Sequence, residues 1–321
     1  MERLKIVYPV CCGMDVHRDF LIACIAATNA QGVTEYQSRR FSTYTGSLRE
    51  LRDWLLANDC KDVCMESTGK YWFPVHNILE ESCHVVVSHP KFVKAIKGKK
   101  TDKKDAQWIA DLFKHDLVRG SFIPPKDIRQ LRDLCRYWVK LSSYMTGEKN
   151  RAQNCLTVSN FKLDDVFSNV FGKSASAITT QLLEHPGEQF DVAPFVDGRC
   201  KTPIAQIQEA VDGIFTYEQA EKLKIIRGHM DSLERHKAEL ESLILEIAQN
   251  YLPQIELLLT VPGIHDAFTA IRILAEIGAD MTVFDTSKHL CSWAGLTPQN
   301  AESAGKKKTT RIGKSGAYLK P

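Results

Sequence analysis

Three stretches rich in strand-forming residues follow one another at the start of the chain, and this order limits the folds open to it. Residues 4–16 are mainly apolar, residues 20–28 form a second such run, and residues 33–41 alternate between apolar and polar side chains. Residues 29–32, Asn-Ala-Gln-Gly, are typical of a turn between two strands. The pattern predicts a meander of three consecutive strands.

Helices and strands are expected to alternate after this meander. A helix should begin with Ser47 as its N-cap. One face of that helix carries four leucines, Leu48, Leu51, Leu55 and Leu56. Short buried strands are predicted at 62–66 and 84–88, with a helix at 71–81 between them and another helix starting near Thr101. This order is that of an RNase H-like α/β fold, and α/β domains place ligands at strand ends.

The region after Pro124-Pro125 is predicted to be mainly helical. Residues 127–160 have apolar side chains at helical spacing, whereas residues 161–203 mix Gly, Pro and Ser and predict no particular fold. From Leu223, apolar side chains recur at steps of three and four, which predicts a coiled coil or a long helical hairpin that ends at Pro253. Its partner is either the 127–160 helix of the same chain or the same helix of a second chain.

The last part of the chain contains further helical patterns. Residues 256–278 indicate two apolar helices joined by a turn at Pro262-Gly263. Residues 281–321 are expected to hold a short helix around 287–294, followed by a polar, basic, glycine-rich tail. The Pro-Gly turn is either a helix-hairpin-helix-like element that offers backbone N–H groups to DNA phosphate or a plain structural turn.

Composition narrows the class of protein. Of the 321 residues, 44% are hydrophobic and 25% are charged, as in ordinary globular proteins. No apolar run approaches the roughly 20 residues that cross a bilayer, and the N-terminus lacks the cleavage site of a signal peptide. Among ten scattered cysteines, Cys60 and Cys64 lack a second pair for zinc. We therefore expect a cytoplasmic protein with no membrane partner and with reduced, mostly buried cysteines.

Two clusters of basic residues stand out although the formal net charge is only +3. The first cluster comprises Lys91, Lys94, Lys97, Lys99, Lys100, Lys103 and Lys104. The second comprises Lys306, Lys307, Lys308, Arg311 and Lys314. A local cluster attracts phosphate groups even where the total charge is small. Each is either a nucleic-acid contact or a solvated surface. The contact is favoured because the first cluster adjoins Asp102 and Asp105 and the second adjoins Ser303, which are the candidate active residues considered below.

Four acidic residues occupy positions where an α/β fold binds ligands. Asp15 and Glu66 each end an apolar strand, and Asp102 and Asp105 are three residues apart on one helix face. Singly, Asp15 is compatible with a strand-end turn, and Asp102 with a first-turn acid favoured by the helix dipole. Gathered together, they need a positive partner, and Mg²⁺ is the natural one. Two such ions about 4 Å apart stabilise the attacking and leaving oxygens in phosphoryl transfer.

Three motifs in the first half of the chain resemble the transposases of the IS110 family. They are Gly13-Met14-Asp15-Val16-His17, Glu66-Ser67-Thr68-Gly69 with Tyr71-Trp72, and Lys100-Thr101-Asp102-Lys103-Lys104-Asp105-Ala106. The resemblance implies a RuvC-like domain whose Asp-Glu-Asp-Asp set binds Mg²⁺. Carried over to this sequence, the catalytic and metal-binding set is Asp15, Glu66, Asp102 and Asp105.

The end of the chain resembles the C-terminal transposase domain of the same family. The matching segments are residues 259–264, 275–278, 293–298, 302–306 and 311–316. The resemblance implies that Ser303 is a nucleophile that forms a covalent phosphoserine linkage with DNA, with Ser315 as the less favoured candidate. Two departures from the family stand out. Ser303-Ala304-Gly305 replaces the commoner Ser-Gly, and His265 replaces a glycine, which favours the plain turn at Pro262-Gly263.

The resemblance suggests three domains. Residues 1–123 are expected to form the RuvC-like metal-binding domain, and residues 124–252 a helical, coiled-coil region. Residues 253–321 are expected to form a mainly helical serine domain. The family normally continues with a long helix, so the chain is expected to be truncated at Pro321.

The resemblance also implies a function, a Mg²⁺-dependent DNA transposase that cuts and rejoins strands in the bacterial cytoplasm, associated with the nucleoid. A structured guide RNA would select the DNA sites. A dimer or tetramer would bring the front domain of one subunit to the serine of another. Two alternatives stay open. One is a metal-dependent nuclease resembling Holliday-junction resolvases, with no covalent serine step, and the other is a truncated remnant that binds nucleic acid without cutting it.

Overall fold

The structure of the chain is a computed structural model. It describes residues 4–93, 101–298, 301–303, 306–309, 311–312 and 316–319. Two compact units, Met1–Ile123 and Pro124–Pro321, make up the chain and are described one at a time. Within these described ranges, no helix is both long and apolar enough to cross a membrane. All ten cysteines are free and seven of them are buried, which confirms that they are mostly buried.

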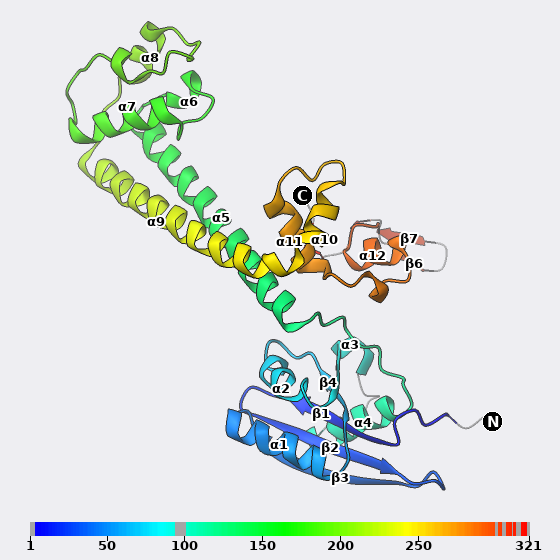
Figure 1. The fold of residues 1–321 in the computed structure, drawn as a ribbon. Helices are drawn as coiled ribbons and strands as arrows, with labels where there is room; N and C mark the ends of the chain where they lie inside the picture. Colours follow the sequence, from blue (N-terminus) through cyan, green and yellow to red (C-terminus); the bar gives the residue numbers. More distant parts are fainter. Residues whose placement is uncertain are drawn as a thin grey trace. The chain divides into compact units, whose positions relative to one another are not determined.

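A mixed sheet of five strands forms the centre of the first unit (Figure 1). Its strands are β1 (Val10–Val16), β2 (Phe20–Thr28), β3 (Thr34–Ser42), β4 (Asp62–Glu66) and β5 (His84–Ser88). The order across the sheet is β3-β2-β1-β4-β5. The first three strands pair antiparallel, whereas β1, β4 and β5 run parallel. This topology confirms the predicted meander and the RNase H-like arrangement of the first unit.

Helices cover both faces of the sheet, so the first unit has three layers. The helices α1 (Thr45–Ala57) and α2 (Trp72–Leu79) share an apolar core with Met14 and other side chains on one face. The helix α4 (Asp102–Lys114) packs on the opposite face, together with the short α3 (Pro90–Val93). Burial on both faces explains why the central strands are almost entirely apolar in sequence.

The strands β1 and β4 bring their terminal acids to the face that α4 covers. Cys11 of β1 and Cys64 of β4 belong to the apolar core beneath α4. Side chains in a strand alternate between faces with a period of two residues. Asp15 therefore shares the face of Cys11, and Glu66 shares the face of Cys64. The two-residue repeat thus directs both acids toward one helix.

The close approach of α4 to β1 depends on a glycine. A Cβ atom at Gly13 would lie 2.3 Å from the carbonyl oxygen of Ala106 and 2.3 Å from the backbone nitrogen of Ala110, closer than real Cβ atoms come. The thiol of Cys11 also donates to the carbonyl oxygen of Ala110 at 3.6 Å. Gly13 thus sets the spacing between the strand that carries Asp15 and the helix that carries the other acids.

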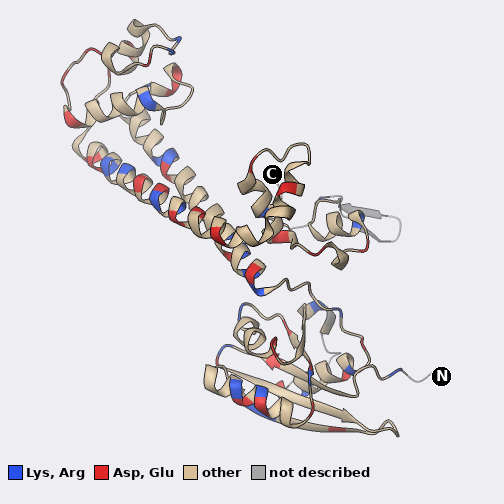
Figure 2. Ribbon diagram, viewed as in Figure 1, with Lys and Arg blue, Asp and Glu red and all other residues tan. Residues whose placement is uncertain are grey.

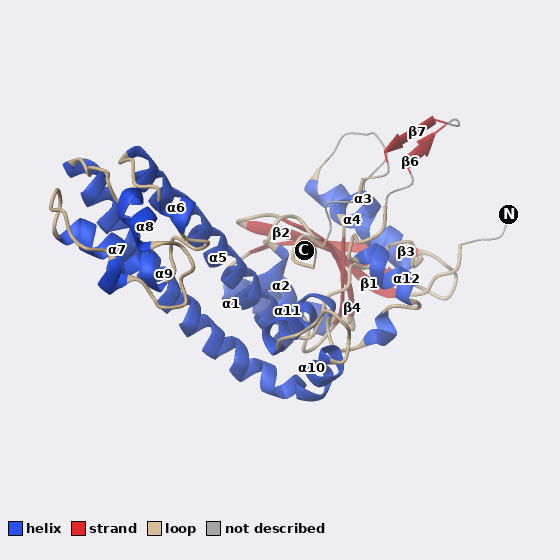
Figure 3. Cartoon of the chain, turned by 90° about the horizontal axis from the view of Figure 1, so that it is seen from above, coloured by secondary structure: helices blue, strands red, loops and turns tan. Residues whose placement is uncertain are grey.

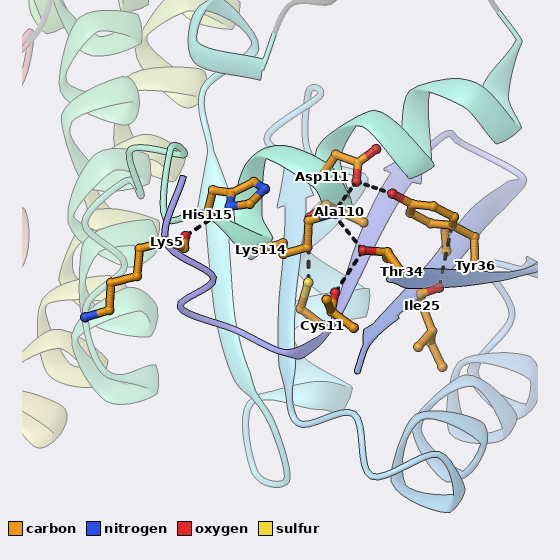
Figure 4. Close-up of polar contacts among 11 residues, drawn as sticks. Lys5, Cys11, Ile25, Thr34, Tyr36, Ala110, Asp111, Lys114 and His115 are labelled. Atoms are coloured by element: carbon orange, nitrogen blue, oxygen red, sulfur yellow. Dashed lines mark hydrogen bonds and ion pairs between the residues drawn. The ribbon is translucent and has the colours of Figure 1, made fainter. Parts of the chain in front are cut away.

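A polar network attaches the C-terminal end of α4 to β3 (Figure 4). The buried ammonium group of Lys114 donates to Asp111 Oδ1 at 2.9 Å and to Thr34 Oγ1 at 3.2 Å. The hydroxyl of Tyr36 donates to the same carboxylate oxygen of Asp111. The backbone N–H of Val7 donates to the carbonyl oxygen of Lys114 at 2.9 Å. These contacts hold α4 at the end opposite Asp102 and Asp105.

The start of α1 differs from the prediction. The helix begins at Thr45 with Tyr44 at its N-cap, so the assignment of Ser47 as N-cap is wrong. The hydroxyl of Ser47 instead accepts a hydrogen bond from the backbone N–H of Ser42, at the end of β3. The predicted apolar face is also narrower than expected, because Leu56 is 38% exposed while the other three leucines are buried.

Two long antiparallel helices form the arm of the second unit, defined here as α5 (Lys126–Val158) and α9 (Tyr217–Ala248). Leu141 of α5 packs against Leu233 and Leu240 of α9 in the middle of the arm. The partner of the predicted heptad helix is therefore the earlier helix of the same chain. Figure 2 shows acidic and basic residues interspersed along α9, as expected for a helix with a solvated outer surface.

Small helices gather at one end of the arm. They are α6 (Leu163–Val166), α7 (Lys173–Glu184), the 3₁₀ helix η1 (Ala193–Phe195) and α8 (Ile204–Ala210). Their apolar side chains share one core with the C-terminal part of α5 and the N-terminal part of α9. This tip of the arm contains residues 161–203, for which the sequence predicted no fold.

A second apolar core lies at the opposite end of the arm. It joins α5 and α9 to α10 (Leu252–Leu259) and α11 (Ala267–Ile277), after the 3₁₀ helix η2 (Gln249–Tyr251). The prediction that Pro253 ends the heptad helix is wrong. That residue lies in the first turn of α10, where proline loses no helical hydrogen bond. Figure 3 shows how strongly helices dominate this unit.

The last part of the chain contains a small sheet. The elements after α11 are the 3₁₀ helix η3 (Met281–Val283), α12 (Ser287–Trp293), β6 (Ala301–Ser303) and β7 (Lys306–Thr309). The helix α12 confirms the short helix predicted there. The hairpin of β6 and β7 replaces the polar tail expected from the sequence. Pro298, before β6, and Ile312, after β7, form an isolated antiparallel bridge.

Candidate active site

Acids that are far apart in the sequence line one cavity of the first unit. The cavity has a volume of about 640 Å³, and its lining includes Asp15, His17, Glu66, Asp102 and Asp105. Two of the acids stand at the ends of β1 and β4, which are neighbouring parallel strands of the sheet. The other two stand in the first turn of α4. The cavity is therefore lined by acids from strand ends and by acids from a helix, as expected from the sequence.

The first turn of α4 is built to present acids. Thr101 is the N-cap, and its hydroxyl oxygen accepts a hydrogen bond from the backbone N–H of Lys104 at 3.3 Å. Asp102 and Asp105 follow in that turn, where the helix dipole stabilises negative charge. Their separation of three residues places both on one side of the helix. Together with the close approach at Gly13, this geometry brings them toward the strand ends.

The acids influence each other electrostatically. The side chain of Asp15 is 14% exposed, against 50% for Asp102. Burial raises the pKa of Asp15, His17 opposes this effect, and the negative charges of Asp102, Asp105 and Glu66 raise the pKa further. The three neighbouring carboxylates are therefore close enough to disfavour the ionised form of Asp15. A cation in the cavity would relieve this repulsion.

His17 is a residue of the cavity to which the sequence analysis gave no role. Its Nε2 atom lies 3.2 Å from Asp15 Oδ2 and 3.8 Å from Asp102 Oδ1. One ligand atom from each of these three residues lies within 4.8 Å of the other two, a spacing compatible with a divalent metal ion. The sequence did contain the signal, because a residue two positions after Asp15 on an extended chain points to the same side.

Three further side chains shape the walls of the cavity. The hydroxyl of Thr68 donates to Glu66 Oε1 at 3.1 Å and so restrains that carboxylate. The indole N–H of Trp108 donates to the carbonyl oxygen of Val93 at 3.2 Å, which ties α4 to α3. Lys91 of α3 also lines the cavity, so a cationic side chain stands near the acids.

The predicted nucleic-acid-binding residues are described only in part. Lys103 and Lys104 are exposed in the first turn of α4, beside the acids. Arg311 is exposed after the hairpin, and the backbone of residues 306–308 belongs to β7. The remaining predicted contacts, Lys97, Lys99, Lys100 and Lys314, lie outside the described residues.

Ser303 belongs to the second unit, in the β6–β7 hairpin. It is the last residue of β6, and its register partner in β7 is Lys306. Glu302 pairs in the same way with Lys307. The basic segment predicted beside Ser303 is thus its partner strand. Ser315 lies outside the described residues.

Two protein-family models match the chain, one at each end. A model of DEDD transposases of the IS110 group, described as "Transposase", matches residues 12–160. A model described as "Transposase IS116/IS110/IS902 family" matches residues 255–320. The chain belongs to the IS110 family of transposases. These are enzymes that act on DNA. The first match includes the four acids of this transposase, and the second includes Ser303.

Solved structures with some similarity to the transposase were also found. RuvC of Thermus thermophilus has 14% identity and a TM-score of 0.29, covering 35% of this chain and 99% of that chain. The same protein in complex with a Holliday junction substrate has 13% identity and a TM-score of 0.27, covering 35% and 99%. The Fowlpox virus resolvase in complex with Holliday junction DNA has 14% identity and a TM-score of 0.23, covering 32% and 72%. No curated protein matches the chain.

Proposed function

We propose that this transposase cuts and rejoins DNA strands with two chemical centres. Asp15, Glu66, Asp102 and Asp105 hold Mg²⁺, and Ser303 forms a covalent bond to the DNA. A structured guide RNA selects the DNA sites. The observation that carries the proposal is that four carboxylates, from two strand ends and one helix, line a single cavity.

The donor set of the cavity fits a hard divalent cation. Carboxylate oxygens are preferred ligands of Mg²⁺. Burial raises the pKa of Asp15 and the negative charges of the neighbouring carboxylates add to this effect, a repulsion that a bound cation relieves. The imidazole of His17 is a softer donor, so we assign it to orienting Asp15 rather than to binding Mg²⁺. When bound, Mg²⁺ would stabilise negative charge on the phosphate oxygens during transfer.

Basic side chains near the cavity would guide the DNA backbone to the acids. Lys91 lines the cavity itself, and Lys103 and Lys104 are exposed on the same turn as Asp102 and Asp105. Cations within reach of a phosphate raise its local concentration and neutralise its charge. The proposal therefore includes a steep decrease of DNA affinity with rising salt.

Ser303 would supply the covalent step. Its Oγ attacks a phosphorus atom, the Oγ–P bond forms and one P–O bond of the strand breaks. The hydroxyl proton leaves the serine, and the departing sugar oxygen takes up a proton. The phosphoserine linkage conserves the energy of the phosphodiester, so the reverse attack rejoins the strands. Support comes from the lysine-rich β7, whose Lys306 is the register partner of Ser303.

The proposal also includes an oligomer. The acidic cavity belongs to the first unit and Ser303 to the second. In a dimer or tetramer, the acids of one subunit would meet the serine of another and form a composite site. Such an arrangement would let chain assembly control when DNA is cut.

Two finer features of the helical region belong to the same proposal. We propose that the arm is a coiled coil, on the basis of its heptad spacing. We also propose that the connection from α10 to α11 acts as a helix-hairpin-helix-like element. Gly263 in that connection has a φ of 98°, a conformation that favours glycine, and because glycine has no Cβ atom its backbone is open to an approaching phosphate.

A metal-dependent nuclease without a covalent step is the second candidate. It is favoured by one observation, because the first unit forms the acidic cavity from its own residues alone. In that case a water molecule would take the place of Ser303 as the nucleophile.

The variant Ser303→Ala separates the two candidates. Supplied with Mg²⁺, guide RNA and matched DNA, it should form neither protein–DNA adducts nor rejoined strands, while calorimetric titration shows normal Mg²⁺ binding. The exposed Ser292 of α12 provides a control, and Ser292→Ala should form adducts as the parent does. Adducts that persist in Ser303→Ala would exclude Ser303 as nucleophile. Cutting without any adduct in the parent chain would favour the nuclease.

A further inference from the structure

The segment that follows the Ser303 hairpin returns to the body of the second unit. Pro298 and Ile312 form a bridge across the base of the hairpin. Gly316 has a φ of 67°, and a Cβ atom there would lie only 1.7 Å from the carbonyl oxygen of Ala294. The backbone at Gly316 therefore packs directly against the end of α12. Two residues that follow the hairpin, Ile312 and Gly316, are thus held by contacts with other parts of the second unit.

A third residue after the hairpin, Tyr318, contacts Arg136 of α5. The Cζ atom of Arg136 lies 4.8 Å from the centroid of the Tyr318 ring, in a cation–π contact. Arg136 also donates from Nε and Nη2 to the two carboxylate oxygens of Glu276, both at 2.7 Å. Such a bidentate pair fixes the plane of the guanidinium group. The ring of Tyr318 therefore contacts a cation with one defined orientation.

Glu276 joins two arginines of α5 to the end of α11. Its side chain is only 8% exposed. Arg132 donates from Nε and Nη2 to the carbonyl oxygens of Ala275 and Glu276, at 2.8 and 2.9 Å, and so satisfies the end of α11. Its Nε atom also lies 4.0 Å from Glu276 Oε2. We call Arg132, Arg136, Glu276 and Tyr318 the Glu276 clamp.

The clamp is one of two sets of contacts that join α5 to α11. Apolar side chains already join these helices in one core, among them Ile128 and Leu131 of α5 and Leu274 of α11. A buried ion pair is often no more stabilising than apolar residues of similar volume, but it specifies one geometry. The feature that distinguishes this pair is Tyr318, which brings the chain after the hairpin to the arginine.

We propose that the Glu276 clamp positions the hairpin that carries Ser303, with Glu276, Arg136 and Tyr318 as positioning residues for the covalent step. The clamp holds Tyr318, six residues along the chain from Ile312, and the bridge between Ile312 and Pro298 holds the base of the hairpin. The assignment to the covalent step rests on the proposed role of Ser303, whereas the proposed hold on the hairpin is independent of that role.

Limited trypsin digestion of the full chain measures that hold directly. Trypsin cuts after lysine, and residues 306–308 of β7 are three lysines in a row. Tyr318→Ala removes the cation–π contact and should raise the cutting rate at these lysines roughly two- to fivefold. Tyr318→Phe keeps the ring and should behave as the parent. The exposed Arg199 at the tip of the arm gives an internal reference, whose cutting rate should not change.

Adduct formation tests the link to the reaction. Tyr318→Ala should slow the formation of protein–DNA adducts, while Mg²⁺ affinity and unfolding temperature stay at parental values and Tyr318→Phe restores the rate. Arg136→Lys keeps the charge but loses the bidentate geometry, so it should resemble Tyr318→Ala in both assays.

The two ideas can fail separately. An unchanged cutting rate after residues 306–308 in both Tyr318→Ala and Arg136→Lys would overturn the clamp, whatever the activity. Trypsin could cut the variants faster while the parent chain never forms adducts. This result would keep the clamp as a structural hold and overturn the covalent role of Ser303. Faster cutting with an unchanged adduct rate would overturn its link to catalysis.

Discussion

Replacing Gly13 with alanine should disturb the acidic cavity without changing any acid. The added Cβ atom would lie 2.3 Å from Ala106 O and from Ala110 N, both backbone atoms of α4. Ordinary contact begins at 3.4 Å. Backbone atoms cannot rotate away as a side chain can, so α4 must move by roughly 1 Å in a close-packed interior. The moving helix carries Asp102 and Asp105.

This displacement has two measurable effects. Overpacking of a core lowers the free energy of unfolding by about 1–3 kcal/mol. A reaction that depends on placement loses up to about 100-fold in rate for an error of about 1 Å. We therefore expect Gly13→Ala to unfold at a lower temperature, to bind Mg²⁺ more weakly and to lose most of its Mg²⁺-dependent cutting of DNA.

Thermal unfolding, calorimetric Mg²⁺ titration and DNA-cutting rates test this expectation together. Gly46→Ala is the matched control, because a Cβ atom at Gly46 in α1 meets nothing within 4 Å. That variant should stay within about 0.5 kcal/mol of the parent. Parental stability and Mg²⁺ affinity in Gly13→Ala would refute the argument that glycine sets the distance between β1 and α4.

Three other substitutions in the first unit have defined outcomes. Asp105→Asn should abolish Mg²⁺-dependent cutting while the fold stays as stable or becomes more stable, because it removes one of the charges that repel Asp15; unchanged activity would remove Asp105 from the metal-binding set. Burial raises the pKa of Asp15, so its ionised form destabilises the metal-free fold. Asp15→Asn should therefore increase the unfolding temperature at neutral pH, and this gain should disappear as the pH falls through the folded-state pKa toward the ordinary value. A gain that grew with acidity would contradict that sign. Lys114→Met leaves the carboxylate of Asp111 without its buried cation and should cost about 1–3 kcal/mol in denaturant unfolding. The exposed Lys103→Met on the same helix should cost less than about 0.5 kcal/mol, and equal losses would count against the network.

The topology of the first unit is predictable because its signals are local. Alternating or continuous apolar runs and turn residues mark each strand, and their order determines the sheet. The positions of Asp15 and Glu66 at strand ends follow from the same runs. The close approach at Gly13 cannot be predicted in this way, because a glycine in an apolar strand does not indicate which helix packs against it. The two-residue step that brings His17 to the acids is visible in the sequence once the strand is known.

Elements that depend on distant contacts are harder to predict. Ser47 has the side chain of an N-cap, but its hydroxyl bonds to the end of β3. Residues 161–203 form helices that become stable only against the arm, and each is too short to be recognised alone. The β6–β7 hairpin is small and polar, so it lacks the apolar alternation that identifies strands. For Ser47, a tertiary contact outweighs the local preference, whereas the other two regions lack a local signal.

The participation of α5 in three separate apolar cores restricts how this protein can change in length. Ile128, Leu141 and Cys155 each belong to a different core along its 33 residues. One inserted residue turns a helix by about 100°, so an insertion between Leu141 and Cys155 would rotate the tip core away from its partners on α9. Natural insertions and deletions in the arm should therefore come in matched blocks of roughly seven residues, in both helices at once. Chimeras that exchange tips between relatives need the same register at both splice points.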